Sequence, residues 1–198
     1  MGGEVTGTLD RRAAVRALLD GRGDALVVCG LGSPGYDVFA AGDHDGNFYL
    51  WGAMGGAASV GLGLALAQPA RPVLVVTGDG EMLMGLGSLA TVGASRPANL
   101  GVVVLDNGRY GETGMQESHT ALGTDLCGVA RAAGFASVAE ASDLPGIAAI
   151  RPGLLMAEGG PRFVVVRVAP EEVPRALPMR DGAALKLRMR AHLGYHPE

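Results

Sequence analysis

Short runs of apolar and β-branched residues alternate along the chain with longer segments in which apolar residues recur at helical spacing. The predicted strands are residues 25–29, 73–77, 100–105, 136–139 and 162–168. The predicted helices are residues 11–19, 33–37, 51–68, 82–94, 125–133, 142–158 and 183–193. Because the strands are nearly continuous apolar runs, we expect both of their faces to be covered. The pattern therefore predicts an α/β fold, a doubly wound and mostly parallel sheet with helices on both faces.

Polar residues and loops separate these segments. Thr124 and Ser142 stand where we expect the N-caps of two helices, and Gly134 follows the end of the first. Residues 107–121 form a polar connection that is too long for a simple turn, so a functional role is expected there.

The length and composition favour a single domain. The chain has 198 residues, of which 48% are hydrophobic and 18% charged, enough for one substantial core. We expect residues 1–198 to form one domain. Its last part, residues 170–198, contains two prolines and a basic helical segment, and is expected to pack on the domain or on a partner.

Charge and hydropathy narrow the class of protein. The net charge of −4 gives no basic surface for nucleic acid. The apolar stretch 53–67 is Gly-rich and shorter than a membrane span, and the N-terminus lacks the apolar region of a signal peptide. Cys29 and Cys127 are too far apart in sequence for a CxxC metal site. These features predict a cytoplasmic protein that binds neither membranes nor nucleic acid.

Two polar residues follow neighbouring strands of the predicted sheet. Asp79 lies between Gly78 and Gly80 after one strand, and Asn107 follows the next. The carboxyl ends of parallel strands meet at one edge, where open α/β sheets bind ligands. A carboxylate, an amide oxygen and a turn carbonyl suit Mg²⁺ with diphosphate and water as its other ligands, and the glycines let backbone approach a phosphate. The alternatives are a structural turn, a bare Mg²⁺ site or a nucleotide-phosphate site.

The spacing of these motifs resembles that of enzymes dependent on thiamine diphosphate (ThDP). Residues 48–55, 61–67 and 106–114 extend the similarity, which covers about residues 25–193. The chain resembles the ThDP-dependent 2-oxo acid decarboxylases, and within them the diphosphate-binding (PP) domain that forms the β subunit in enzymes of the sulfopyruvate and phosphonopyruvate decarboxylase type. One departure is Asp106, where relatives often carry asparagine, although its side chain can still order the turn.

The resemblance implies ThDP and Mg²⁺ as cofactors. It gives Mg²⁺ the Asp79 carboxylate, the Asn107 amide and the Arg109 carbonyl, and it makes Met54 a wedge that bends the cofactor. Because a carboxylate near a diphosphate is unfavourable, we expect the Glu81 side chain to turn outward and only its backbone to take part. The residues expected to bind the cofactor are Gly52, Ala53, Met54, Gly78, Asp79, Gly80, Glu81, Asn107, Tyr110 and Gly111.

Three residues are candidates for catalysis. Glu112 lies where related decarboxylases carry a polar group over the cofactor's thiazolium ring, or it is a solvated loop residue. His44 stands between two aspartates, which favour its protonated form. His119, with Gln116, Ser118 and Thr120, could bind a substrate acid group or close a lid. The alternative for each histidine is a surface position.

The resemblance also implies a partner. ThDP enzymes need a glutamate against the pyrimidine ring, and in the family it lies on a separate pyrimidine-binding domain. Glu4, Glu112 and Glu140 do not fit that role, and 198 residues leave no room for a second such domain. We therefore expect a homodimeric core of this chain flanked by two pyrimidine-binding (α) subunits in a heterotetramer.

The implied reaction is the non-oxidative decarboxylation of a small anionic 2-oxo acid that carries a second acidic group, giving an aldehyde. A ThDP carboligase of the acetolactate synthase type shares the early steps and stays open as an alternative. An oxidoreductase β subunit is less favoured because the chain has no cysteine cluster. A non-catalytic ThDP-binding subunit is the alternative outside the enzymes.

Overall fold

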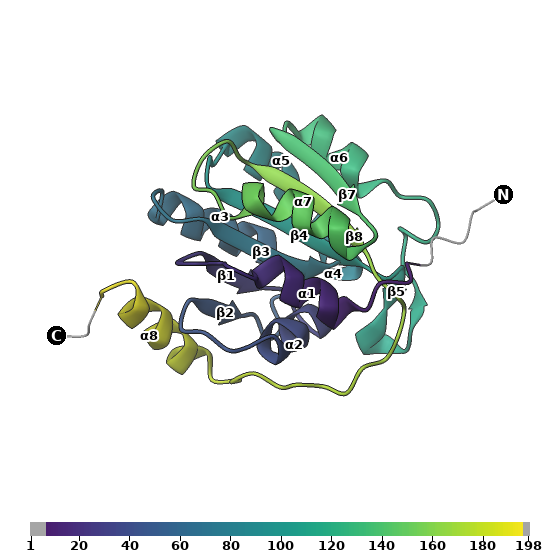
Figure 1. Ribbon diagram of the computed structural model, residues 1–198, viewed down its shortest axis with the longest axis horizontal. Helices are drawn as coiled ribbons and strands as arrows, with labels where there is room; N and C mark the ends of the chain where they lie inside the picture. The colour runs from purple at the N-terminus through teal and green to yellow at the C-terminus, as the bar shows by residue number, and fades with distance from the viewer. Residues whose placement is uncertain (1–6, 196–198) are drawn as a thin grey trace.

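The computed structural model describes residues 7–195, which form a parallel sheet between two layers of helices (Figure 1). The sheet has six strands in the order β2-β1-β3-β4-β8-β7, and every neighbouring pair is parallel. The strands are β1 (Leu26–Cys29), β2 (Asn47–Tyr49), β3 (Val73–Gly78), β4 (Leu100–Asp106), β7 (Ser137–Ala141) and β8 (Arg162–Arg167). The predicted α/β class is therefore confirmed.

The helices divide between the two faces of the sheet. They are α1 (Arg11–Leu19), α2 (Ser33–Ala40), α3 (Ala57–Ala67), α4 (Asp79–Met84), α5 (Ser88–Ser95), α6 (Leu126–Ala133), α7 (Leu144–Leu154) and α8 (Gly182–His192). Alternation along β3 sends Val73 and Val75 into the core under α3, α5 and α6, and Leu74 and Val76 into the core under α1, α2 and α7. A small hairpin, β5 (Arg109–Tyr110) and β6 (Gln116–Glu117), stands outside the sheet.

The long helix predicted at 82–94 is wrong, because the chain forms two helices that are separated at residues 85–87. Gly85 packs its backbone directly on Gly55, and a Cβ atom on Gly85 would lie 2.0 Å from the carbonyl oxygen of Gly55. The predicted start of helix 51–68 is also wrong, since residues 51–56 form turns and α3 begins at Ala57. A long-range backbone contact thus decides both boundaries.

The two predicted N-caps are each displaced by one residue. Asp125 caps α6 through a 2.8 Å hydrogen bond from the Gly128 amide, and Asp143 caps α7 through a 2.7 Å bond from the Gly146 amide. Thr124 and Ser142 therefore lie outside their helices. The local reason is that an aspartate follows each of them and takes the capping position, for which it is equally suited.

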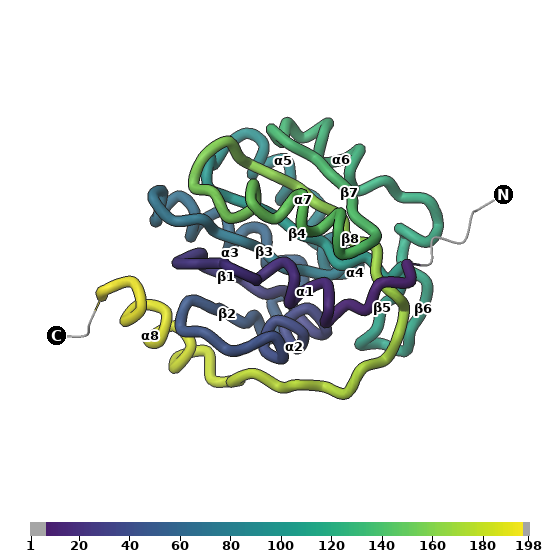
Figure 2. Tube along the Cα trace, viewed as in Figure 1, coloured from purple at the N-terminus to yellow at the C-terminus, as the bar shows by residue number. Residues whose placement is uncertain are grey.

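The C-terminal segment, residues 170–195, crosses the edge of the molecule beside α2 and β2 (Figure 2). Met179 accepts a 2.8 Å hydrogen bond from the Trp51 indole on its carbonyl, and Arg188 of α8 forms a 2.6 Å ion pair with Asp43.

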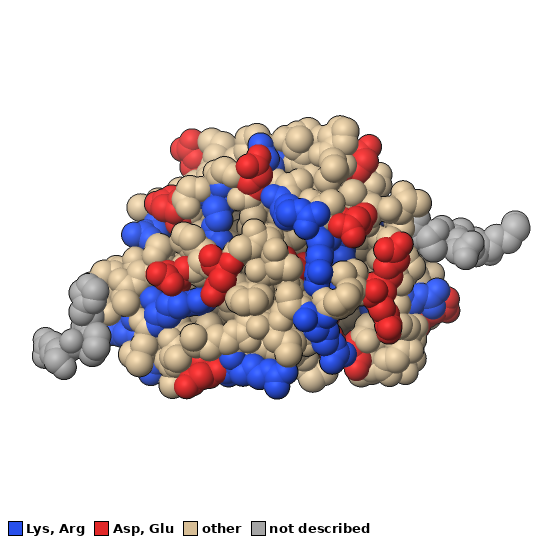
Figure 3. All heavy atoms as spheres, turned by 60° about the horizontal axis from the view of Figure 1, so that its bottom comes forward, with Lys and Arg blue, Asp and Glu red and all other residues tan. Residues whose placement is uncertain are grey.

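Basic and acidic side chains are interspersed on the face drawn in Figure 3. None of the helices in residues 7–195 has the length and apolar character needed to cross a membrane.

Two glycines of the α5 region provide a matched test of this packing. A Cβ atom on Gly93 would lie 1.7 Å from the carbonyl oxygen of Ala133, which is backbone and cannot yield cheaply. We expect Gly93→Ala to lower the free energy of unfolding by about 2–3 kcal/mol, because α5 and α6 must separate. Gly87 has φ −60° and nothing within 4 Å of an added Cβ, so Gly87→Ala should stay within about 1 kcal/mol of the natural chain. Urea unfolding of both variants tests the contact, and equal midpoints would contradict it.

Candidate active site

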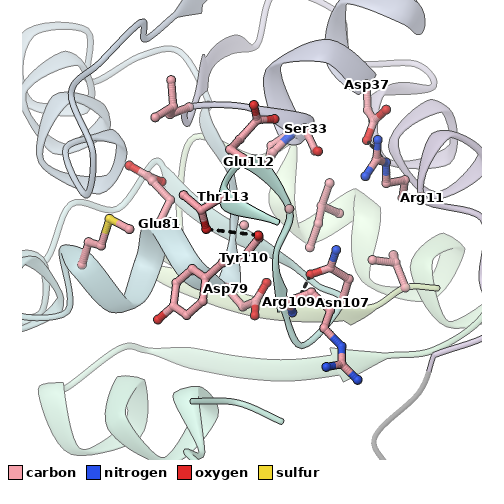
Figure 4. Close-up of a pocket in the computed structure, with 18 of the residues that line it drawn as sticks. Arg11, Ser33, Asp37, Asp79, Glu81, Asn107, Arg109, Tyr110, Glu112 and Thr113 are labelled. Atoms are coloured by element: carbon pink, nitrogen blue, oxygen red, sulfur yellow. Dashed lines mark hydrogen bonds and ion pairs between the residues drawn. The ribbon is translucent and has the colours of Figure 1, made fainter. Parts of the chain in front are cut away.

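A pocket of about 130 Å³ lies at the carboxyl ends of β3 and β4 (Figure 4). The two strands pair in register from Val73 with Leu100 to Gly78 with Leu105. Asp79 and Asn107, which follow them, therefore both line the pocket. The structure thus brings together the two residues that the sequence marks as metal ligands.

Asp79 is the first residue of α4 and is only 2% exposed. Its Oδ2 atom accepts a hydrogen bond from the Ser118 hydroxyl and lies 3.1 Å from the Thr120 hydroxyl. Burial, and then the neighbouring Asp106, raise the pKa of Asp79 to about 6. A bound cation would remove much of this penalty, because an opposite charge favours the ionised form.

Asp106 connects this carboxylate to the neighbouring strand β8. The Thr120 hydroxyl lies 2.8 Å from Asp106 Oδ1, and Asp106 Oδ2 forms a 2.5 Å ion pair with Arg167. The same Oδ1 accepts a 3.0 Å hydrogen bond from the Gly108 amide. Asp106 therefore orders the turn after β4, as expected from the sequence.

Asn107 and Arg109 are held by the hairpin that follows. Asn107 Oδ1 accepts a 3.0 Å hydrogen bond from the Arg109 amide. The Ser118 amide donates to the Gly108 carbonyl across the hairpin, so Arg109, the next residue, directs its N–H and C=O away from β6. The Arg109 carbonyl thus lies on the same side as Asn107, whereas its guanidinium pairs with Glu117 at 3.3 Å.

These donors fit Mg²⁺. Within residues 7–195 no group of three or more His, Cys, Asp or Glu side chains is placed to hold a metal. The pocket offers one carboxylate, one amide oxygen and one main-chain carbonyl, from Asp79, Asn107 and Arg109. Such a set leaves positions for phosphate oxygens and water, which Mg²⁺ retains in nucleotide and diphosphate sites.

The glycines of the pocket serve packing as well as access. A Cβ atom on Gly80 would lie 2.6 Å from the Tyr110 ring, so Tyr110 covers this glycine directly. Gly78 and Gly111 have no atom closer than 3.6 Å to an added Cβ. The three glycines and Tyr110 all line the pocket. The Tyr110 hydroxyl also lies 3.1 Å from His119 Nδ1.

Met54 lies on another wall of the pocket and is 55% exposed, so it is not an ordinary core residue. Met84, 51% exposed, lies on the same pocket. Gly52 and Ala53 are exposed and precede Met54 in a turn, for which Gly52 adopts φ +98° and Gly55 φ +82°. Positive φ at both ends requires glycine, and the turn directs Met54 to the pocket.

The Glu81 side chain does not turn outward, contrary to expectation. It is 8% exposed, accepts a 3.1 Å hydrogen bond on Oε1 from the Ala57 amide, and accepts a hydrogen bond on Oε2 from the Thr77 hydroxyl. Burial raises its pKa, although nearby amides oppose this. The backbone donors at the start of α3 offer this carboxylate partners that solvent was expected to supply.

The three catalytic candidates have different positions. Glu112 lines the pocket and pairs with Arg175 at 3.4 Å. His119 is exposed and touches the pocket only through Tyr110. The assignment of His44 to this pocket is wrong, because His44 precedes β2 and lies at the amino ends of the strands, the opposite edge.

The expected protonation of His44 is also wrong. Burial, followed by Arg22 and His192, lowers its pKa, and these effects outweigh Asp43 and Asp45. Its Nδ1 atom accepts a 2.9 Å hydrogen bond from the Gly46 amide. His44 therefore contributes to the packing of α8 on β2, where its ring lies 5.2 Å from that of His192.

Several residues of the site have roles that the sequence did not indicate. Ser118 and Thr120 were expected at a substrate or a lid, yet they are buried against Asp79. Arg11 and Asp37 line the pocket and form a 2.8 Å ion pair. Burial raises the pKa of Asp37 despite this arginine. The sequence did contain one signal for this part of the pocket. Strand β1 runs parallel to β3, so the segment that follows β1 and contains Asp37 begins at the same edge of the sheet.

Comparison with known proteins gives a consistent picture. Residues 39–167 match the family model described as thiamine pyrophosphate enzyme, C-terminal TPP binding domain. Sulfopyruvate decarboxylase subunit beta of Methanococcus maripaludis is 36% identical over 168 residues, covering 84% of this chain and 89% of that protein. Its counterpart in Methanothermobacter thermautotrophicus is 41% identical over 162 residues, covering 82% of this chain and 83% of that protein. Phosphonopyruvate decarboxylase of Streptomyces viridochromogenes is 45% identical over 163 residues, covering 74% of this chain but 41% of that protein.

Solved structures share the fold. A protein from Mycobacterium smegmatis described as thiamin diphosphate-dependent has a TM-score of 0.71 at 25% identity, covering 84% of this chain and 33% of that one. The 2-oxoglutarate:ferredoxin oxidoreductase of Magnetococcus marinus has a TM-score of 0.65 at 17% identity, covering 90% of this chain and 74% of that one. The second similarity concerns the fold alone.

Proposed function

The chain belongs to the thiamine pyrophosphate enzyme family, and from this membership we propose that it is the β subunit of a two-component 2-oxo acid decarboxylase dependent on ThDP and Mg²⁺. The observation that carries the proposal is the pocket in which Asp79 and Asn107 meet at adjacent strand ends. The relatives that cover most of the chain are decarboxylase subunits, which supports the same reaction class.

The residues of the pocket have separate roles in this proposal. Asp79, Asn107 and the Arg109 carbonyl hold Mg²⁺, and the backbone at Gly78 and Gly80 accommodates the diphosphate. Met54 supports the thiazolium end of the cofactor. When bound, ThDP supplies the electron sink for the loss of CO₂. The protein contributes binding and orientation, and Ser118 and Thr120 fix the carboxylate of Asp79.

The proposed substrate is a 2-oxo acid with a second acidic group, of the sulfopyruvate or phosphonopyruvate kind, and the product is an aldehyde. The names of the relatives support this class. On this chain, Glu112, which lines the pocket, and His119, which reaches the pocket through Tyr110, are the candidates to hold or move a proton there.

The proposal includes a separate pyrimidine-binding subunit that supplies the catalytic glutamate. The glutamates that line the pocket are engaged elsewhere, Glu81 with α3 and Glu112 with Arg175. The chain covers 83–89% of two β subunits but 41% of phosphonopyruvate decarboxylase. The names of those two relatives are those of subunits, which supports a partner, and we infer that a second chain carries the pyrimidine domain and that two copies of each assemble as a heterotetramer.

The test is an assay of the purified chain with ThDP, Mg²⁺ and sulfopyruvate, phosphonopyruvate or pyruvate, with and without a pyrimidine-domain subunit from a neighbouring reading frame. We expect CO₂ and an aldehyde only from the pair of subunits. Rapid CO₂ release by the chain alone would refute the two-component arrangement. A hydroxyketone product would indicate a carboligase, and ThDP binding without turnover by the pair would indicate a non-catalytic subunit.

A further inference from the structure

Glu81 is a buried carboxylate for which the proposed reaction has no use. It lies two residues after Asp79 on α4 and reaches across to the start of α3. We propose, on the basis of the proposed function, that Glu81 is a positioning residue: it fixes residues 52–56, and with them Met54, against the pocket by capping α3 from outside that helix.

Helix α3 lacks a cap of its own. Its N-cap residue is Gly56, which has no side chain to accept a hydrogen bond, and its first turn contains no acidic residue. The first amides of a helix have no partner within the helix, and a negative charge is favourable beside them. Glu81 Oε1 accepts the Ala57 amide at 3.1 Å and so supplies the missing acceptor from another element.

The same carboxylate is fixed on its other side. Oε2 accepts a hydrogen bond from the hydroxyl of Thr77, which is completely buried in β3. Gly30 leaves the necessary space, because a Cβ atom there would lie 2.5 Å from Glu81 Oε2. Glu81 therefore connects the sheet rigidly to the first turn of α3.

Residues 52–56 have few other contacts that could hold them in place. Gly52, Ala53 and Met54 are exposed, and the turn is closed by a 2.8 Å bond from the Gly56 amide to the Ala53 carbonyl. The other anchor is the close approach of Gly55 to Gly85. Glu81 is part of α4 and Gly85 follows directly at its C-terminus, so the helix that begins with Asp79 also sets the position of Met54.

The inference concerns both ends of a bound ThDP. Asp79 holds the diphosphate end through Mg²⁺, and Met54 supports the thiazolium end. Loss of Glu81 should loosen the Met54 segment and leave the Asp79 site intact. Inorganic diphosphate with Mg²⁺ probes the Asp79 end alone, whereas ThDP with Mg²⁺ probes both ends.

The experiment compares Glu81→Ala and Glu81→Gln with the natural chain, and uses Glu158→Ala as a control that removes an exposed carboxylate. Trp51, the single tryptophan of the chain, stands next to the segment and reports on it by acrylamide quenching. We expect Glu81→Ala to speed amide exchange at residues 55–58 by about tenfold and to increase Trp51 quenching. ThDP affinity should fall by about tenfold, with diphosphate affinity changed less than about threefold. Glu81→Gln keeps an acceptor for the Ala57 amide and should restore most of each readout.

Equal exchange and quenching in Glu81→Ala and the natural chain would overturn the inference. So would equal defects in Glu81→Gln and Glu81→Ala, because the acceptor would then be irrelevant. If Glu81→Ala fails to fold, Glu81→Gln alone decides: protected amides at 55–58 support the inference and unprotected ones contradict it. If the natural chain binds neither diphosphate nor ThDP, the proposed function fails, while amide exchange and Trp51 quenching still test the role of Glu81.

Discussion

Asp79→Ala is expected to reduce the Mg²⁺-dependent affinity for ThDP by at least about a hundredfold, since metal and diphosphate are held together by one charged ligand. The substitution removes the only carboxylate among the three proposed Mg²⁺ ligands. Isothermal calorimetry with ThDP and Mg²⁺ measures the effect, and circular dichroism verifies that the variant is folded. Unchanged affinity in a folded Asp79→Ala protein would show that the pocket at β3 and β4 is not the cofactor site.

Asp79→Asn separates binding from stability. Burial and Asp106 raise the pKa of Asp79 to about 6. A folded-state pKa above the unfolded value means that the group favours folding below about pH 4 and loses that contribution as pH rises through 6. In the cofactor-free chain at pH 7.5, the ionised carboxylate therefore destabilises the fold by about 1–3 kcal/mol.

We accordingly expect Asp79→Asn to melt higher than the natural chain at pH 7.5 and at the same temperature near pH 4. Mg²⁺ with ThDP should raise the melting temperature of the natural chain and leave that of Asp79→Asn unchanged. Thermal scans at the two pH values, with and without the cofactors, check all of this. The assignment would be contradicted if Asp79→Asn melts lower than the natural chain at pH 7.5. It would also be contradicted if Mg²⁺ with ThDP raises the melting temperature of the variant as much as that of the natural chain.

Most of the sheet could be predicted because its signals are local, although the short edge strand β2 was not among the predicted strands. Residues 73–77 and 100–105 are β-branched runs that have no alternative as amphipathic helices, and the structure confirms strands at both. The helix predicted at 82–94 failed because its break depends on Gly55, which is distant in sequence. The local spacing of apolar residues cannot indicate a contact between residues that are distant in sequence.

The same distinction between local and long-range signals applies to the residues of the site. Asp79 and Asn107 could be placed together from the sequence, because two strand ends and a parallel sheet suffice to bring them to one edge. The contacts of Ser118 and Thr120 with Asp79 could not, since they depend on the path of the hairpin β5–β6. His44 could not be placed from its flanking aspartates, because they do not show that His44 precedes β2 and so lies at the amino ends of the strands, away from the pocket.

Met54→Ala is expected to reduce turnover by the reconstituted enzyme by about a hundredfold, because a misplaced cofactor loses its reactive geometry. The free energy of unfolding should change by less than about 0.5 kcal/mol, since the side chain is 55% exposed and is not part of the core. Met54→Leu, which keeps an apolar side chain of similar volume, should retain most of the activity.

The matched control is Met156→Ala, which removes a methionine that is 44% exposed and lies outside the pocket. Steady-state decarboxylation and urea unfolding of the three variants separate the two explanations. A role in bending the cofactor requires that Met54→Ala loses activity without losing stability, while Met156→Ala loses neither. If Met54→Ala turns over as fast as the natural enzyme, Met54 does not support the cofactor, and the alignment of residues 51–55 with the family segment is wrong. If Met54→Ala unfolds more readily in proportion to its loss of activity, the side chain stabilises the turn at Gly52–Gly55 rather than the bound ThDP.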